Sequence, residues 1–258
     1  MTTASKPAAA LLLQAGRAAL LESQTPSAAD ALRFAAALFR AQAQVAEALW
    51  AAPLTGALDA DAPALLEPAR ALLLSIAEAA PSPLAEAARE RRAESADRFV
   101  ARLQVYFCGD SGDYLSRAIL QPYARTLAAR ALPPDRPRPE QGCPFCGGAP
   151  AIAARRPESD STRRLLCCAL CGGEWQVNRI HCPSCNEENP ARLPHFQSDT
   201  HASARIEACE TCHRYVKSID LSVDGRLIPE VDDLCSIALD LWALEQGFSR
   251  IEPGLLGI

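Results

Sequence analysis

The feature that most constrains this chain of 258 residues is a set of four Cys-x-x-Cys pairs between residues 143 and 212. Two intervening residues let both sulfurs of a tight turn face one cation, and two such turns complete a tetrahedron at metal–sulfur distances of about 2.3 Å. A single pair could equally be a redox motif, but four pairs at matched spacing indicate two metal ions with sulfur-only coordination. The predicted ligands are Cys143, Cys146, Cys168, Cys171, Cys182, Cys185, Cys209 and Cys212.

The residue after each pair supports this geometry. A knuckle turn needs a positive φ there, which glycine adopts without penalty and asparagine tolerates better than other residues. Gly147 and Gly172 follow the first two pairs, Asn186 follows the third, and His213, a less favourable residue, follows the fourth. Four protein ligands leave no open coordination position, so the expected role is structural or electron-transferring. Zinc and iron both suit such sites.

Two pairings of the knuckles are compatible with the sequence. The gaps 147–167 and 186–208 each have room for two short strands and a turn, whereas 172–181 has room for one strand. Economy of loop length favours sequential pairing, first with second and third with fourth. Crossed pairing, first with third and second with fourth, is the alternative.

The remaining cysteines and the histidines are not expected to bind metal, since eight cysteines already form two complete sets. Buried thiols are predicted for Cys108, Cys167 and Cys235. The most apolar N-terminal stretch, residues 8–21, is interrupted by polar residues and predicts no membrane insertion. We therefore expect a cytoplasmic protein. A reducing compartment in turn favours thiolate–metal bonds over disulfides.

The rest of the chain is predominantly helical. Residues 1–132 are rich in alanine and leucine and predict a helical bundle, with a capping box at Ser27–Asp30 opening a helix to Trp50. Apolar periodicity predicts a C-terminal helix over about 231–244, capped by Gly247. Further helices are expected at about 62–79, 83–107 and 113–131.

The predicted fold class is therefore α plus small β, in which a helical bundle is followed by two rubredoxin-like or zinc-ribbon modules and a C-terminal helix. A proline-rich stretch reads as a stiff linker between the two halves. The expected parts are a helical domain (1–132), the linker (133–142), a first metal module (143–180), a second metal module (181–222), and a C-terminal helix with its tail (223–258).

Charge and local sequence weigh against two other functions. Residues 143–220 contain nine basic and nine acidic side chains, whereas a nucleic-acid-binding ribbon needs a basic face. The basic pairs Arg155-Arg156 and Arg163-Arg164 are expected on a solvated hairpin. A thiol–disulfide redox protein is the other alternative, but Gly147-Gly-Ala-Pro150 cannot open the helix that activates such a thiol. The chain also lacks a nucleotide-binding fingerprint, so it is predicted not to be an enzyme.

The order of motifs resembles the FdhE family of formate dehydrogenase accessory proteins. The series runs Cys143-Pro-Phe-Cys-Gly, Arg164-Leu-Leu-Cys-Cys-Ala-Leu-Cys with Glu174-Trp175, Arg179-Ile-His-Cys-Pro-Ser-Cys, Arg205-Ile-Glu-Ala-Cys-Glu-Thr-Cys with Tyr215-Val-Lys217, Asp232-Asp233-Leu, Leu239-Asp240 and Gly247-Phe-Ser-Arg250. It spans about 143–250. The resemblance implies a cytoplasmic maturation factor that binds the catalytic subunit of formate dehydrogenase before export. It also implies two rubredoxin-like iron ions per chain, or zinc in recombinant protein, held by the eight cysteines above.

Two further expectations concern surfaces and stability. A client-binding surface is expected where the metal modules meet the helical half, with Tyr215 and Lys217 lining it. Replacing a ligand, as in Cys143→Ala or Cys212→Ala, is expected to unfold the module around its own site and to spare the helices, because a ribbon core is too small to hold without its cation.

Overall fold

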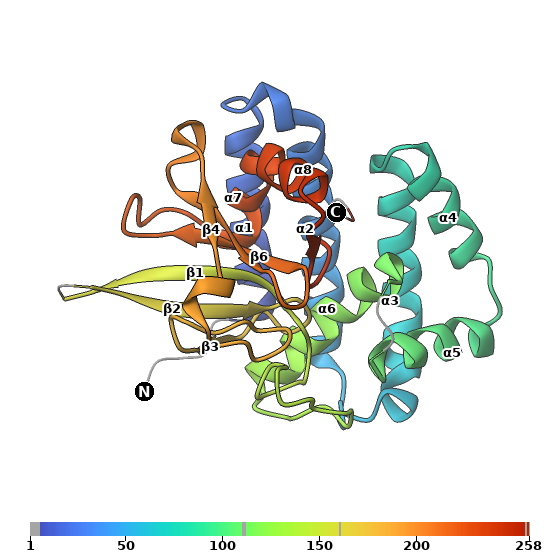
Figure 1. Ribbon diagram of the computed structural model, residues 1–258. Helices are drawn as coiled ribbons and strands as arrows, with labels where there is room; N and C mark the ends of the chain where they lie inside the picture. Colours follow the sequence, from blue (N-terminus) through green and yellow to red (C-terminus); the bar gives the residue numbers. More distant parts are fainter. Residues whose placement is uncertain (1–5, 110–111, 160, 256, 258) are drawn as a thin grey trace.

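The structure is a computed structural model that describes residues 6–109, 112–159, 161–255 and 257. Its N-terminal half is a bundle of helices, and its C-terminal half is built on one sheet beside that bundle (Figure 1). The helices of the first half are α1 (Pro7–Glu22), α2 (Ala29–Ala51), α3 (Leu58–Ala79), α4 (Ser82–Arg92), α5 (Ala96–Phe107) and α6 (Tyr114–Ala129). The helical half expected from composition is thus present.

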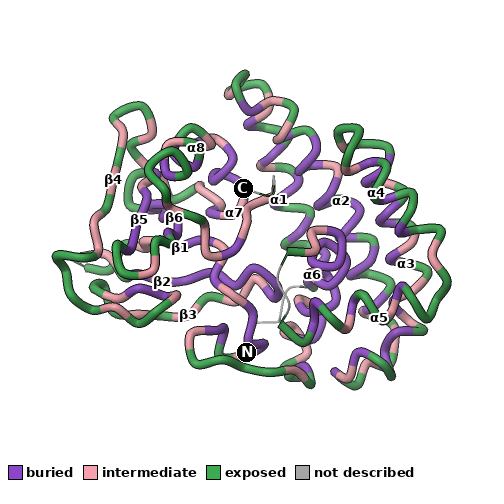
Figure 2. Tube along the Cα trace, turned by 45° about the vertical axis from the view of Figure 1, so that its right-hand side comes forward, coloured by how far each residue is buried: buried purple, intermediate pink, exposed green. Residues whose placement is uncertain are grey.

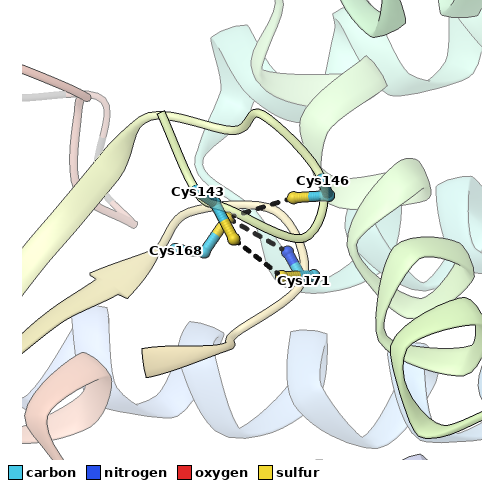
Figure 3. Close-up of side chains that lie close together, drawn as sticks. All are labelled: Cys143, Cys146, Cys168 and Cys171. Atoms are coloured by element: carbon cyan, nitrogen blue, oxygen red, sulfur yellow. Dashed lines mark hydrogen bonds between the residues drawn. The ribbon is translucent and has the colours of Figure 1, made fainter. Parts of the chain in front are cut away.

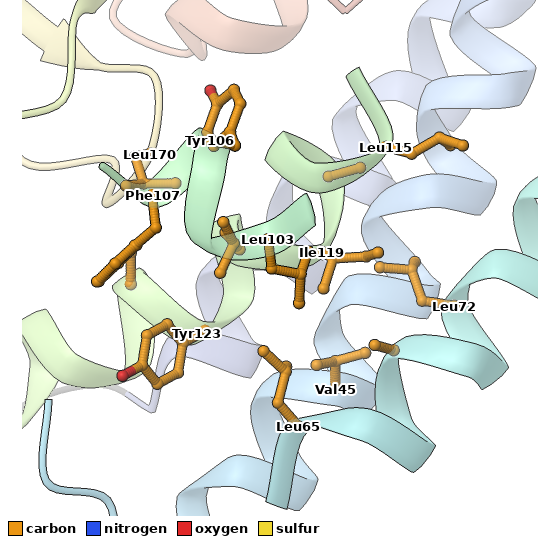
Figure 4. Packing of buried hydrophobic residues seen from close by; sticks show 14 of the residues in the cluster. Val45, Leu65, Leu72, Leu103, Tyr106, Phe107, Leu115, Ile119, Tyr123 and Leu170 are labelled. Carbon is orange, nitrogen blue, oxygen red and sulfur yellow. The ribbon is translucent and has the colours of Figure 1, made fainter. Parts of the chain in front are cut away.

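Helices α2 and α6 form the centre of the bundle, and buried positions run along both of them (Figure 2). Leucines and aromatic rings from α3, α5 and α6 meet there, including Leu65, Leu103 and Tyr123 (Figure 4). Arg130 closes the C-terminal end of α2, where its guanidinium donates to the carbonyl of Ala52 at 2.9 Å. Such a contact satisfies carbonyls that have no partner within the helix.

Two details of the predicted helices are wrong. The expected capping box does not form, because a short 3-10 turn (Pro26–Ala28) precedes α2 and no side chain caps it. The single helix expected over 83–107 is two helices, α4 and α5, separated by a break at residues 93–95. Glu94, inside that break, forms ion pairs with Arg98 and Arg102 of α5. The periodicity of apolar residues gives no sign of these ion pairs.

The C-terminal half contains a seven-stranded sheet in the order β3-β2-β1-β6-β5-β4, with β7 paired to β6. Two antiparallel hairpins, β1–β2 and β5–β6, are joined by parallel pairing of β1 with β6, in which Ala153 lies opposite Ser218. The strands are β1 (Pro150–Glu158), β2 (Ser161–Cys168), β3 (Glu174–Gln176), β4 (His195–Gln197), β5 (Ala204–Cys209), β6 (Arg214–Asp220) and β7 (Ser249–Arg250). The two cysteine modules therefore share one sheet.

The C-terminal segment returns to the helical half. The predicted single helix is divided into α7 (Pro229–Asp232), a 3-10 turn (Asp233–Ser236) and α8 (Ile237–Glu245). Val231 and Leu234 enter the apolar cluster formed by α1 and α2, and Asp232 pairs with Arg17 of α1 at 2.5 Å. Gly247 has a φ of +82° just past α8, as its capping role predicts. This return ties the two halves of the chain together.

The proline-rich stretch packs against the rest of the protein. Asp135 donates its amide to the carbonyl of Gly56, and Pro133 lies so near Gly56 that an added Cβ there would come within 2.9 Å of its carbonyl oxygen. Further along, Pro137 and Arg138 pack directly on Gly147. No helix among the described residues is both long and apolar enough to cross a membrane.

Candidate metal centres

The first candidate centre brings together Cys143, Cys146, Cys168 and Cys171 (Figure 3). Their four sulfurs lie within 4.8 Å of one another, with Sγ–Sγ separations of 3.7 Å for Cys143 and Cys171 and 3.4 Å for Cys146 and Cys168. Cys143 and Cys146 lie in the loop before β1, Cys168 is the last residue of β2, and Cys171 lies in the loop between β2 and β3. Folding of the β1–β2 hairpin therefore brings two distant knuckles face to face.

The second candidate centre repeats the arrangement with Cys182, Cys185, Cys209 and Cys212. The separation is 3.7 Å both for Cys182 with Cys212 and for Cys185 with Cys209. Sequential pairing of the knuckles is thus confirmed.

Both sets of sulfurs fit a tetrahedral ion. A tetrahedron whose corners lie about 2.3 Å from its centre has edges of about 3.8 Å, close to the separations observed. A disulfide would instead need about 2.05 Å between two sulfurs. The donor set is four soft thiol groups in each centre, which suits zinc or iron.

The four knuckles share one backbone conformation. In each, the amide four residues after the first cysteine donates to that cysteine's carbonyl, at distances from 2.7 Å (Gly147 to Cys143) to 3.2 Å (Gly172 to Cys168). The residue making this bond has a positive φ in every case: +70° at Gly147, +69° at Gly172, +62° at Asn186 and +54° at His213. The prediction from local sequence is confirmed at all four positions.

Backbone amides also point at the sulfurs. Leu170 and Cys171 donate to Sγ of Cys168 at 3.3 and 3.5 Å, and Gly173 donates to Sγ of Cys171 at 3.4 Å. Ser184 makes the same contact to Cys182 in the second centre at 3.4 Å. Such bonds favour the thiolate over the thiol, because a charged acceptor makes the stronger hydrogen bond.

The two centres differ in their surroundings. All four cysteines of the first centre are buried, and they belong to the same apolar cluster as Leu103, Phe107 and Tyr123 of the bundle. Leu170, between two of its ligands, packs beside Phe107 (Figure 4). In the second centre Cys185 is exposed and Cys212 is half-buried.

The other cysteines and the histidines lie outside both candidate centres. Cys167 is buried and Cys235 half-buried, and burial raises the pKa of both thiols. The expectation for Cys108 is wrong: it lies exposed just past the end of α5. Every candidate metal group found within the described ranges consists of cysteine alone. The pKa of His181, beside Cys182, is lowered by burial and by Arg164.

The basic hairpin pairs are only partly solvated. Arg156 and Arg163 carry exposed ion pairs with Glu174 and Glu158. Arg164, however, is buried and donates to Glu207 of the neighbouring hairpin at 2.8 Å and to the carbonyls of Asn178 and His181 at 3.0 and 3.1 Å. Burial would raise the pKa of Glu207, but the charges of Arg164 and Arg205 lower it. Arg164 thus joins the two hairpins.

Several of the motifs noted in the C-terminal half meet in one buried ionic cluster. Lys217 pairs with Asp233 at 3.0 Å and with Asp240, and Arg250 pairs with the same two carboxylates at 3.1 and 3.2 Å. Tyr215 donates its hydroxyl to Asp240 at 2.8 Å. Two cations and two anions balance one another, as buried charges must.

This ionic cluster corrects an expectation. Tyr215 and Lys217 are 1% and 0% exposed, so they cannot line a binding surface. They fasten β6 to the C-terminal segment instead. Burial raises the pKa of Tyr215, and Asp240 raises it further. Burial opposes ionisation of Asp233, but Arg250 and Lys217 hold the pKa of that carboxyl below its ordinary value. Sequence spacing gives no sign that these residues meet.

A groove of about 600 Å³ does lie where the metal modules meet the helical half. We call it the junction groove. Its walls come from the end of α5, the proline-rich stretch, the first centre's loops and the loop between Cys182 and Cys185. Both candidate centres therefore border it, through Gly147 and Leu170 on one side and through Pro183 and Ser184 on the other.

The fold and the sites define a class of protein: a helical bundle carrying two rubredoxin-like cysteine centres in one sheet. Comparison with known proteins shows which family the C-terminal half resembles. The model described as "FdhE, central domain" matches residues 142–179, and the one described as "FdhE, C-terminal domain" matches residues 180–256. Residues 142–256 of this chain match these two FdhE domain models, and the resemblance of the motif series is confirmed.

Individual relatives agree with this assignment. A protein named "Protein FdhE homolog" from Aquifex aeolicus is 35% identical over 116 residues, 45% of this chain and 41% of the relative. One of the same name from Pseudomonas putida is 36% identical over 135 residues, 49% of this chain and 42% of the relative. The matched segments thus span about two fifths of these relatives' length.

A solved structure extends the comparison to the helical half. The crystal structure of the FdhE protein from Pseudomonas aeruginosa superposes with a TM-score of 0.69 over 95% of each chain, at 24% sequence identity. The two proteins share one fold, including the helical region.

Proposed function

We propose that this chain is an accessory factor that binds the catalytic subunit of a formate dehydrogenase in the cytoplasm and is needed for formation of the active enzyme. The observation that carries the proposal is the pair of all-cysteine centres on a scaffold with the FdhE fold. The match of residues 142–256 to the FdhE domain models supports an accessory role related to formate dehydrogenase.

We further propose that the eight cysteines of the two centres each bind metal through Sγ, with two iron ions per chain in the cell. Four thiolates around one ion leave no position for substrate, which argues for a centre that shapes a binding surface or carries electrons. On this proposal the chain by itself does not oxidise formate. Bound iron would supply a one-electron couple, and the residues of this chain would fix its ligand geometry.

Metal content is tested on protein purified without oxygen. Elemental analysis is expected to give two ions per chain, and ferric iron in four-sulfur sites is expected to produce visible charge-transfer bands that zinc lacks. The Cys167→Ala variant removes a buried thiol beside the first centre and is the matched control. It is expected to keep both ions, whereas Cys146→Ser is expected to lose one.

Partner binding is tested by co-purification. The metal-loaded chain and the tagged catalytic subunit are mixed, and complex formation is followed by size-exclusion chromatography. We expect a complex, and no formate oxidation by the chain alone. Absence of a complex between two folded, metal-loaded proteins would contradict the proposed function.

A further inference from the structure

Three arginines give the junction groove positive charge. Arg136 and Arg138 of the proline-rich stretch and Arg214 at the start of β6 line it. None of the three has an ion-pair partner among the residues that the structure describes, although most other arginines of the sheet region are paired with carboxylates, for example Arg155 with Asp220. Arg138 and Arg214 are exposed and Arg136 is half-buried. The guanidiniums of Arg138 and Arg214 are therefore open to a ligand, and that of Arg136, which lies over the Phe107 ring at 5.3 Å, adds its charge to the groove wall.

The carboxylate of Glu252, on the groove wall, does not cancel this charge. Glu252 is buried, pairs with Arg117 at 3.1 Å and accepts a hydrogen bond from the Tyr106 hydroxyl at 3.3 Å. Its charge is already matched on the side facing the bundle. The chain as a whole has a net charge of −5, whereas the groove is positively charged through three arginines without an ion pair among the described residues. The groove therefore favours an anionic ligand.

The other residues that line the groove indicate the shape of the ligand. Leu170, Ile251 and four prolines give the groove apolar walls. The C-terminal end of α5 also opens into it at Cys108 and Gly109, and the negative end of a helix dipole opposes a compact, doubly charged anion. An extended chain avoids this conflict, because it can place carboxylates beside the arginines and apolar side chains elsewhere.

We infer that the junction groove binds an extended peptide segment of the client protein in which acidic and apolar residues are mixed. This inference rests on the proposed function, since it names the part of the client that is recognised. Planar guanidinium groups suit carboxylates because they can donate two parallel hydrogen bonds to one group. Both candidate centres border the groove, so loss of either metal is expected to deform it.

The test uses the metal-loaded full chain and two probes. One probe is the catalytic subunit of formate dehydrogenase, and the other is a synthetic octapeptide of alternating glutamate and leucine, with a glutamine–leucine peptide as its control. Affinity is measured by calorimetry for the wild type, for R136E, R138E and R214E singly and combined, and for R92E. Arg92 is exposed on α4, has no ion pair among the described residues and does not line the groove, so it is the matched control.

We expect each single reversal to weaken binding about tenfold and the combined variant at least about a hundredfold, with R92E unchanged. Raising the ionic strength is expected to weaken wild-type binding, because salt screens the attraction between the arginines and the acidic ligand. The residual binding of the combined variant is expected to strengthen instead, because salt screens the repulsion between its three glutamates and the ligand.

Cys108 supplies an independent readout, since it is exposed and lines the groove. Its modification by a maleimide, followed by peptide mass spectrometry, is expected to slow when either acidic probe is bound. Protection by ATP in place of the peptide would show a small phosphorylated ligand and would overturn the inference. Equal affinity of the glutamine–leucine peptide would overturn it as well.

The outcomes separate the inference from the function on which it rests. If the subunit binds the combined variant as tightly as the wild type and leaves Cys108 reactive, the groove is not the recognition site, although the proposed function stands. If the peptide binds in an arginine-dependent way but the subunit does not bind at all, the groove recognises acidic peptides and the proposed function fails. Failure of both probes overturns both.

Discussion

The first centre lies inside the apolar cluster of the helical bundle, whereas the second lies at the β5–β6 hairpin, with Cys185 exposed. Their knuckles nevertheless follow the same hydrogen-bond pattern and the same backbone angles. The difference therefore comes from what packs around them. Gly147 in the first centre touches the proline-rich stretch, while its counterpart His213 in the second lies exposed near the ring of Phe248.

This comparison teaches that one local motif can serve two structural purposes. A metal in the first centre would hold together the thiols and the helices that surround them. A metal in the second would organise mainly its own hairpin. The expectation that a lost ligand spares the helices is therefore retained for the second centre alone.

The largest effect is expected from Cys146→Ser, compared with Cys185→Ser. Structural zinc contributes about 10–16 kcal/mol in small peptides, so losing a ligand of the first centre is expected to lower the free energy of unfolding by on the order of 5 kcal/mol or more. Because Cys146 belongs to the bundle's core, helical circular dichroism in urea is expected to be lost with it. Cys185→Ser is expected to leave that helical transition in place. Coincident transitions in both variants would remove the distinction between the centres.

The next largest loss of stability is expected from Asp240→Asn, which breaks the buried ionic cluster on β6. The substitution leaves Lys217 and Arg250 with one carboxylate between them, and breaking a buried ion pair costs about 3–5 kcal/mol. Because Lys217 lies on β6, which follows Cys212, the variant is expected to release the second centre's metal faster and the first centre's metal at the wild-type rate. Asp224→Asn, which breaks an exposed pair with Arg226, is the control and is expected to change neither.

A smaller loss of stability is expected from a substitution at Gly147, because this residue of the first centre is more closely packed than its counterpart His213 in the second. Gly147→Ala would place a Cβ 2.3 Å from the carbonyl oxygen of Pro137, in a backbone conformation with φ of +70°. Left-handed strain and overpacking together are expected to cost about 2–4 kcal/mol. His213→Ala keeps a side chain at the same kind of φ and is expected to change stability by about 0.5 kcal/mol or less. Equal losses in urea melts of the two variants would show that the linker contact does not matter.

The smallest effect is expected in the rate of metal release from the wild type. Cys185 is exposed and the first centre is buried, so a chelator is expected to remove one ion per chain at least about tenfold faster than the other, a difference of about 1.4 kcal/mol in barrier. A colorimetric chelator in excess reports the two phases. Release of both ions in one phase would mean that burial does not protect the first centre.

The sequence by itself determined the local chemistry of this protein. The Cys-x-x-Cys spacing, the residues after each pair and the lengths between them were enough to predict two four-cysteine centres, their pairing and four positive φ angles, all of which the structure contains. These features depend on contacts within a few residues, or on loop lengths that can be counted along the chain. The helical character of residues 7–129 was likewise readable, because it follows from composition.

The tertiary structure decided how those parts are used. Parallel pairing of β1 with β6 made one sheet of two modules, and the return of the C-terminal segment to α1 joined the two halves. It also buried Tyr215 and Lys217, exposed Cys108 and placed three arginines in one groove without an ion-pair partner in the described part of the chain. Each of these outcomes depends on partners tens of residues away, such as Asp240 for Lys217. Burial and charge balance are properties of such long-range contacts, and the order of residues along the chain does not specify them.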